Sequence, residues 1–261
     1  MKEQRKKYEL TGEFIEHCNG KKLYRIRALV SFGVVVAGQL GGFVESEKNL
    51  DQSLSGNAWV SGDARVYGNA QVYGNAWVYG DARVYGNAQV YGNARVYGNA
   101  QVYGDAWVSG DARVYGNAQV YGDAWVSGDA RVYGNAWVYG NAQVYGNAQV
   151  YGNARVYGNA WVYGNAQVYG NARVYGNARV RSYAVISERK MIFWASNVGS
   201  ENGTLTVFNG KDGLIVTRGC FTGAVDEFLA KSAEVHDDKT KNEYKLLIEV
   251  AKSRILGVKD E

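Results

Sequence analysis

The sequence contains no proline, and it has only two cysteines and two histidines. A collagen-like chain needs abundant proline with glycine at every third position, and the 34 glycines here do not follow that period. An intrinsically disordered chain has few aromatic residues, whereas this chain has 21 tyrosines and seven tryptophans. The composition therefore predicts an ordered protein that is neither collagen-like nor disordered.

The two cysteines, Cys18 and Cys220, lie far apart in the sequence, and neither belongs to a Cys-x-x-Cys pair. This spacing favours two reduced thiols over a disulfide framework or a zinc site. Phosphate-loop, dinucleotide-binding and zinc-protease motifs are also missing, as is the Gly-x-Ser-x-Gly pattern of serine hydrolases. The sequence thus predicts no catalytic residue, no cofactor and no metal ion.

Charge and hydropathy disfavour two kinds of partner. The net charge is +4, divided as about +2, +3 and −1 among residues 1–55, 56–181 and 182–261, so no segment resembles a basic nucleic-acid-binding tail. Apolar runs such as Val34 to Ala37 are far too short to span a bilayer. Because the charged start of the chain is followed by Tyr-Glu-Leu-Thr rather than by a continuous apolar segment, we expect no secretory signal, no membrane contact and a soluble cytoplasmic protein.

Residues 1–55 carry strand signals followed by irregular, glycine-rich sequence. Residues 8–11 and 22–29 alternate apolar and polar side chains, which predicts strands, and the Asn-Gly pair at 19–20 predicts a hairpin turn between them. Over residues 32–54, aliphatic residues that end with Leu54 recur at spacings near six, which predicts one or two irregular coils. We expect the hairpin to cap the repeat that follows, because an open end would expose unpaired strand edges.

Residues 56–181 consist of twenty-one hexapeptides of the form Gly-(Asn/Asp)-Ala-(Arg/Gln/Trp)-Val-(Tyr/Ser), without insertion or deletion; only the last differs, ending in Arg181. On an extended segment, Ala and Val point to one face and the variable residue between them to the other. Ala and Val would fill a narrow interior, while glycine supplies the positive φ that a corner needs. Three six-residue sides close an 18-residue coil, so the repeat predicts seven coils, about 34 Å long at the usual strand spacing.

The Val-Tyr-Gly-Asn-Ala-Gln pattern is similar to that of hexapeptide-repeat proteins with a left-handed parallel β-helix. The resemblance covers residues 56–181 and implies an all-β solenoid of about seven regular coils. The chain departs from that family after Val, where the family favours small or acidic residues and this chain has Tyr in seventeen of the twenty-one units. We expect these tyrosines to point outward beside the corners and to stack from coil to coil, contributing ~0.2–1 kcal/mol per pair.

Many proteins of this family are acyltransferases, and the resemblance implies a catalytic histidine near a cleft between subunits. Here the histidines, His17 and His236, both lie outside the repeat, so no general base stands where that family would place one. An enzyme is therefore not expected, and acyltransferase activity is the third alternative. Ice binding is disfavoured as well, since residues 56–181 contain no threonine. His17 is expected to be a solvated surface residue.

Folding the repeat at 18 residues places like residues above like in three outer columns. One hypothesis is that tandem duplication copied neighbouring blocks; the other is that outward Trp and Arg form a surface for a partner or ligand. Six aspartates among nine arginines argue against nucleic acid, and the aspartate spacing matches no calcium loop. The candidate surface is Trp59, Trp77, Arg95, Arg113, Arg131, Trp107, Trp125, Trp161, Arg155 and Arg173.

Residues 182–261 predict a small α+β domain. Apolar residues at helical spacing predict helices near 222–229 and 241–255. Cys220 and His236 are a candidate nucleophile and base, but a buried cysteine and a surface histidine are favoured, because no third group is signalled to orient them. The predicted strands are 191–195, 204–208 and 214–217.

The order of these elements, and the sequence Leu-Gly-Gly-Phe-Val-Glu-Ser near the N-terminus, resemble phage and prophage hexapeptide-repeat proteins and their uncharacterised C-terminal domain. The leading hypothesis is a non-enzymatic scaffold or binding protein of phage or prophage origin that self-associates, with a trimer as the assembly that the resemblance implies. The alternative is a phage counter-defence protein that sequesters a small anionic ligand, such as a signalling nucleotide. A host protein stays open as a partner.

Overall fold

The structure, a computed structural model, describes residues 6–17 and 20–257, so Cys18 and the Asn19 of the predicted turn lie outside the described residues. The chain divides into two compact units, Met1–Asn135 and Ala136–Glu261, and each is described by itself. Neither helix in the described part of the chain is long and apolar enough to cross a membrane.

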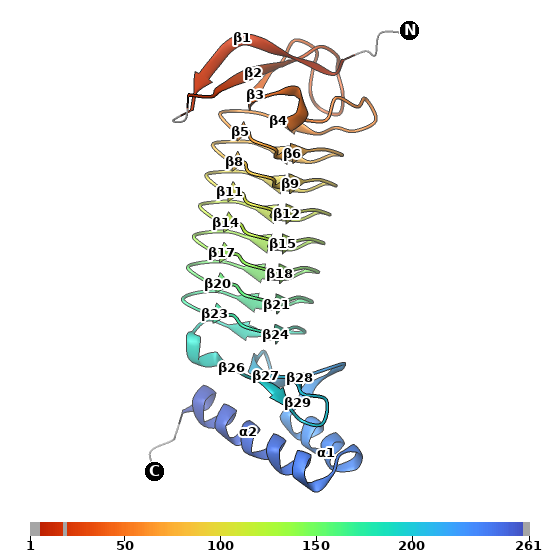
Figure 1. Cartoon of the computed structure of the whole chain (residues 1–261), viewed down its shortest axis with the longest axis vertical. Helices are drawn as coiled ribbons and strands as arrows, with labels where there is room; N and C mark the ends of the chain where they lie inside the picture. Colours follow the sequence, from red (N-terminus) through yellow and green to blue (C-terminus); the bar gives the residue numbers. More distant parts are fainter. Residues whose placement is uncertain (1–5, 18–19, 258–261) are drawn as a thin grey trace. The chain divides into compact units, whose positions relative to one another are not determined.

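The first unit begins with the predicted antiparallel pair, β1 (Tyr8–Glu16) and β2 (Lys22–Ala28) (Figure 1). Strand β3 (Leu40–Val44) pairs antiparallel with β2 and also pairs in parallel with the repeat, setting Phe43 opposite Arg65. The first, irregular coil therefore precedes the repeat, as expected.

The predicted place of Leu54 in that coil is wrong, because its side chain is half exposed while Leu50 is buried and bridges to Val72. A short 3₁₀ turn, η1 (Glu47–Asn49), explains the difference. The Asn49 amide donates to the carbonyl oxygens of Gly68 and Ala70 at 3.0 and 2.9 Å, which fixes the turn and sets Leu50 on the inner face.

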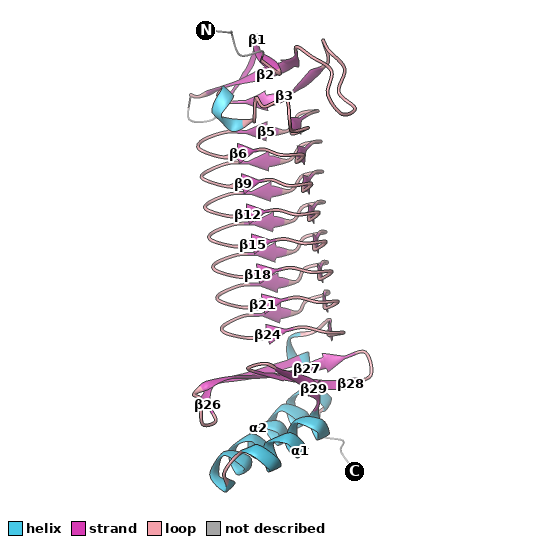
Figure 2. Cartoon of the chain, turned by 90° about the vertical axis from the view of Figure 1, so that its right-hand side faces the viewer, coloured by secondary structure: helices cyan, strands magenta, loops and turns pink. Residues whose placement is uncertain are grey.

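The repeat forms two-residue strands, each made of the variable residue and the following Val, and strands 18 residues apart pair in parallel (Figure 2). Arg95 lies opposite Arg113, and the Arg95 N–H donates to the Ala112 carbonyl at 2.9 Å. In the first unit the strands are β4 (Trp59–Val60), β5 (Arg65–Val66), β6 (Gln71–Val72), β7 (Trp77–Val78), β8 (Arg83–Val84), β9 (Gln89–Val90), β10 (Arg95–Val96), β11 (Gln101–Val102), β12 (Trp107–Val108), β13 (Arg113–Val114), β14 (Gln119–Val120), β15 (Trp125–Val126) and β16 (Arg131–Val132).

The interior of the coils is apolar, as predicted, since every Ala and Val of the repeat is at most 1% exposed. Tyrosines stack on the outside at the expected places: Tyr97 lies between Tyr79 and Tyr115, with ring centroids 4.8 Å apart on both sides. A second ladder was not predicted. The Asn75 side chain donates to Asn93, and Asn93 donates to Asp111, each at 3.1 Å, so amides also connect successive corners.

The second unit continues with the same kind of coil and ends in a sheet with two helices. Strand β25 extends the coils beyond the last hexapeptide, because Val185 and Ile186 pair with Gln167 and Val168. The coil strands are β17 (Trp137–Val138), β18 (Gln143–Val144), β19 (Gln149–Val150), β20 (Arg155–Val156), β21 (Trp161–Val162), β22 (Gln167–Val168), β23 (Arg173–Val174), β24 (Arg179–Val180) and β25 (Val185–Ile186).

After a short 3₁₀ turn, η2 (Arg189–Met191), four antiparallel strands follow one another in the sheet. They are β26 (Ile192–Val198), β27 (Gly203–Gly210), β28 (Gly213–Arg218) and β29 (Phe221–Ala224).

Helices α1 (Val225–Val235) and α2 (Asp238–Leu256) pack on this sheet through a core that includes Phe228 and Ile248. The α+β prediction is correct except at residues 222–224. These residues were predicted as the start of a helix but belong to β29, because they pair with β28, and the helix begins only at Val225.

Candidate functional site

Three arginines of the first unit form a column on its outside. Arg95, Arg113 and Arg131 lie in register on neighbouring strands, and all three side chains are exposed. No carboxylate of residues 6–17 or 20–257 forms an ion pair with them. We call these residues the arginine column; it is a row of positive charges, spaced by one strand, that lacks neutralising partners.

A different sheet of the same unit carries a pair of exposed tryptophans. Trp107 and Trp125 are each 40% exposed, and their ring centroids lie 5.7 Å apart in an edge-to-face arrangement. They line a hollow of about 560 Å³ together with Asp105, Asp123 and two amide side chains. We call Trp107, Trp125, Asp105 and Asp123 the tryptophan–aspartate column.

The exposure of these two indoles follows from the residues next to them. Their hexapeptides end in Ser109 and Ser127 instead of Tyr, so neither hexapeptide adds a phenol ring of its own, and the Tyr91 ring of the preceding coil meets Trp107 edge-on at 6.3 Å. The Trp125 Nε1 donates to the Ser109 hydroxyl at 3.4 Å. In the sequence, both open tryptophans stand in Trp-Val-Ser in place of Trp-Val-Tyr, but Trp59 stands in the same pattern and is buried, so the pattern marks an open indole only where no other segment covers it.

Trp59 does not belong to an exposed surface, and that prediction is wrong. Its side chain is fully buried, because the N-terminal segment covers it. The rings of Tyr8 and Phe32 lie 6.4 and 5.5 Å from the indole, both edge-on. Trp77, in the same column, is half-buried in a hollow of about 330 Å³ that also contains Val34.

Two tryptophans of the second unit already have cationic partners. The Arg155 guanidinium lies 4.6 Å from the Trp137 ring centroid, and Arg179 lies 4.7 Å from Trp161. Cation–π contacts of this kind occupy the ring face. Trp161 and Arg155 were both predicted to belong to a surface for a partner. Each is half-buried, and each already makes a cation–π contact within the chain.

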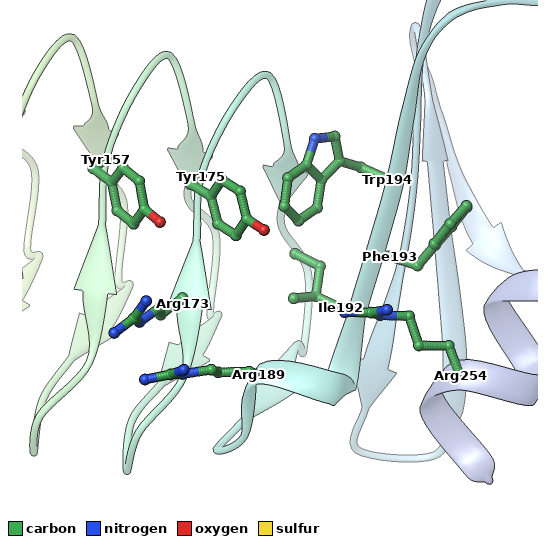
Figure 3. Close-up of a pocket in the computed structure, with 8 residues that line it drawn as sticks. All are labelled: Tyr157, Arg173, Tyr175, Arg189, Ile192, Phe193, Trp194 and Arg254. Atoms are coloured by element: carbon green, nitrogen blue, oxygen red, sulfur yellow. The ribbon is translucent and has the colours of Figure 1, made fainter.

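Arg173, the last predicted site residue, lines a pocket of about 370 Å³ in the second unit (Figure 3). Two further arginines reach this pocket, Arg189 from η2 and Arg254 from α2. Aromatic and aliphatic side chains complete the lining, namely Tyr157, Tyr175, Ile192, Phe193 and Trp194. We call this site the arginine pocket. Sequence patterns did not indicate Arg189, Trp194 or Arg254, since they lie outside the repeat and share no motif.

The remaining candidate groups are Cys220, His236 and His17, and each has surroundings of its own. Cys220 lies in the turn between β28 and β29 and is exposed, so the predicted buried cysteine is wrong. The His236 ring packs against Tyr244, with centroids 5.5 Å apart, and His17 is half-buried beside Tyr67 rather than solvated. Within the described residues, no three His, Cys, Asp or Glu side chains gather in a way that could hold a metal ion.

A comparison with protein families agrees with this geometry. The model of the YdcK beta solenoid repeat matches residues 58–74, 64–80, 70–86, 88–104, 100–116, 106–122, 112–128, 118–134, 124–140, 130–146, 148–164, 166–182 and 172–188. The chain is a β-solenoid repeat protein. Each match begins on the Ala of a hexapeptide, and the last includes β25 of the solenoid. A comparison with curated proteins found no match.

Proposed function

We propose that this β-solenoid protein is a non-enzymatic binding scaffold that associates with copies of itself. In this proposal the arginine column of one copy docks on the tryptophan–aspartate column of the next. The observation that carries it is the complementarity of the two columns: one is cationic and has no ion-pair partner among the described residues, and the other offers two open indoles and two carboxylates in one hollow.

The columns also match in spacing. In each of them, neighbouring members stand one coil apart in register, as Arg95 opposite Arg113 and Trp107 opposite Trp125 show. One correctly placed guanidinium therefore brings the next one level with the next indole. A guanidinium on an indole face contributes about 0.5–1 kcal/mol where exposed and more where water is excluded. The strands are fixed by the coil-to-coil hydrogen bonds, so little ordering is needed on association.

This contact joins two different surfaces, so it closes into a ring or continues as an open chain. The trimer that the resemblance implies is one closed form. Phage or prophage origin, and with it a location in the host cytoplasm, is part of the proposal and rests on the resemblance of the terminal segments alone.

Sedimentation equilibrium tests the proposal. We expect a mass that is a multiple of 28.7 kDa for the native chain, and a shift toward the single-chain mass when Trp107→Gln and Trp125→Gln are combined. Trp161→Gln is the matched control, because Arg179 already covers that indole, and it should leave the mass unchanged. A native chain that sediments as a monomer at high concentration contradicts self-association.

A charge exchange identifies the surfaces. Arg95→Glu with Arg113→Glu should weaken association by one copy, and Asp105→Arg with Asp123→Arg should do the same in another. Mixing the two variants restores opposite charges across the contact, so a mixed complex should form. If neither variant dissociates, or if the mixture stays apart, these columns are not the interface.

A further inference from the structure

The arginine pocket collects three positive charges from three separate elements. Arg173 comes from β23, Arg189 from η2 and Arg254 from the last turn of α2 (Figure 3). The lining contains no carboxylate, and none of the three guanidinium groups forms an ion pair within the part of the chain that the structure describes. Like charges brought together repel one another, so an anion entering here would relieve that repulsion as well as gain hydrogen bonds.

We propose that the arginine pocket binds an organic polyanion that carries a flat ring, of the nucleoside polyphosphate class. This site is independent of the proposed self-association, because its residues all lie in Ala136–Glu261 and belong to neither column. The pocket volume of about 370 Å³ falls within the size range of small-molecule sites, about 300–1,000 Å³.

The cationic side of the pocket suits phosphate groups. A guanidinium is planar and presents parallel N–H donors, which match two oxygens of one phosphate. Three such groups exceed what a single charge needs, so a ligand with two or more linked phosphates uses them best. Arg189 and Arg254 are exposed at their ends and can reorient, while Arg173 is half-buried on a strand that pairs with β20.

The other side of the pocket suits an aromatic ring. Tyr157 and Tyr175 stack at 5.0 Å with nearly parallel planes, and Trp194 meets Tyr175 edge-on at 4.2 Å. Phe193 and Ile192 extend this apolar wall. Stacking of a nucleobase on an aromatic side chain contributes about 1–3 kcal/mol per base. The tyrosine hydroxyls donate to no acceptor within residues 6–17 and 20–257, so they are available to a sugar.

Titration calorimetry of the full chain tests the proposal with three probes: ATP, adenosine and inorganic pyrophosphate. ATP combines ring and phosphates, and we expect it to bind at least tenfold more tightly than either adenosine or pyrophosphate. The affinity should fall as salt is added, because the guanidinium contacts are screened. No heat with ATP at millimolar concentration overturns the site. Equal affinity for pyrophosphate and ATP overturns the role of the ring.

Variants separate the two halves of the pocket. Arg189→Gln with Arg254→Gln should weaken ATP binding by roughly tenfold or more per arginine, the usual effect of losing a charged hydrogen bond. The matched control is Arg113→Gln with Arg131→Gln, which removes the same charge from the arginine column and should leave ATP affinity within about twofold. Trp194→Leu should weaken ATP but not pyrophosphate.

Thermal unfolding of each variant verifies that it is folded. Unchanged ATP affinity in the folded Arg189→Gln and Arg254→Gln variant would place the ligand elsewhere and overturn the proposal. Sedimentation equilibrium without ligand measures self-association, and titration calorimetry measures binding in the arginine pocket. Failure of either proposal can therefore be recognised independently of the other.

Discussion

At the scale of single residues, the glycine at each corner has two tasks at once. Gly86 has a φ of +73°, a conformation that side chains with a Cβ rarely adopt. A Cβ built on it would also lie 2.9 Å from the backbone nitrogen of Gly104 in the next coil. The positive φ is a requirement of the turn itself, and the lack of a Cβ allows the next coil to stack closely. A comparison between two glycines separates these two effects.

We predict that Gly86→Ala destabilises the protein more than Gly219→Ala. Gly219 has a similar φ of +56° but no atom within 4 Å of the position of an added Cβ. Both changes carry the left-handed backbone penalty of about 1–2 kcal/mol, and only Gly86→Ala adds a clash with backbone. Urea unfolding followed by circular dichroism should show the larger loss for Gly86→Ala. Equal losses would mean that the coils shift freely to admit a methyl group.

At the scale of structural elements, the tyrosine ladders connect one coil to the next outside the core. Tyr97 is flanked on both sides by rings at 4.8 Å with almost parallel planes. Each of these contacts adds to the backbone hydrogen bonds that already join the coils. The stacked phenols therefore stabilise the same interface as the buried Ala and Val, from the other face of the strands.

We predict that Tyr97→Leu lowers the free energy of unfolding by about 1–3 kcal/mol, since it removes two aromatic contacts of about 0.5–1.5 kcal/mol each. Tyr183→Leu is the control, because Tyr183 is 58% exposed and makes no ring contact with any described residue. That change should stay within about 0.5 kcal/mol of the native chain. Calorimetry or urea unfolding of the two variants gives the comparison, and a loss for Tyr97→Leu no larger than for Tyr183→Leu would show that the ladder does not contribute.

The elements that the sequence predicts well are those whose information is local. Each hexapeptide contains its own buried Ala and Val and its corner glycine, and most end in an outward Tyr. The outer columns and the tyrosine ladders therefore follow directly from the 18-residue period. The burial of Trp59 depends instead on where Tyr8 and Phe32 fold, and no period in the sequence indicates their position. The exposure of Trp107 and Trp125 is partly predictable from the sequence, because the neighbouring serines indicate it only once the coil geometry is known.

The arginine pocket shows the same limit more strongly. Arg173 belongs to the repeat and was predicted to face outward, but Arg189 and Arg254 come from a turn and a helix more than sixty residues apart. Their proximity arises only when η2 and α2 pack in the second unit. A binding site assembled from the ends of unrelated elements leaves no spacing signal in the sequence.

At the scale of the whole molecule, many phenols of the ladders share one response to pH. Burial raises the pKa of Tyr79 and Tyr115 above the ordinary value, and the neighbouring phenol of Tyr97 raises it further, while nearby arginines oppose the rise. Burial and a neighbouring tyrosine raise the pKa in the same way in other ladder members: Tyr73, Tyr85, Tyr103, Tyr139, Tyr145 and Tyr151.

A raised pKa means that the folded chain holds these protons more tightly than the unfolded chain, whose tyrosines titrate near pH 10. Their contribution to stability is therefore complete below about pH 10 and is lost as the pH rises through the folded pKa values. We predict that the free energy of unfolding falls steadily above pH 10. Urea unfolding at a series of pH values, followed by circular dichroism, measures this fall.

The double variant Tyr79→Phe with Tyr115→Phe tests whether ionisation of these phenols causes the loss of stability above pH 10, because phenylalanine keeps the stacked ring and lacks the ionisable hydroxyl. This double variant should unfold at a higher pH than the native chain while its stability at pH 7 stays within about 1 kcal/mol. Alkaline titrations of both chains, monitored by circular dichroism, measure the two midpoints. Identical midpoints would assign alkaline unfolding to groups other than Tyr79 and Tyr115, since their hydroxyls are the only groups that the two substitutions remove.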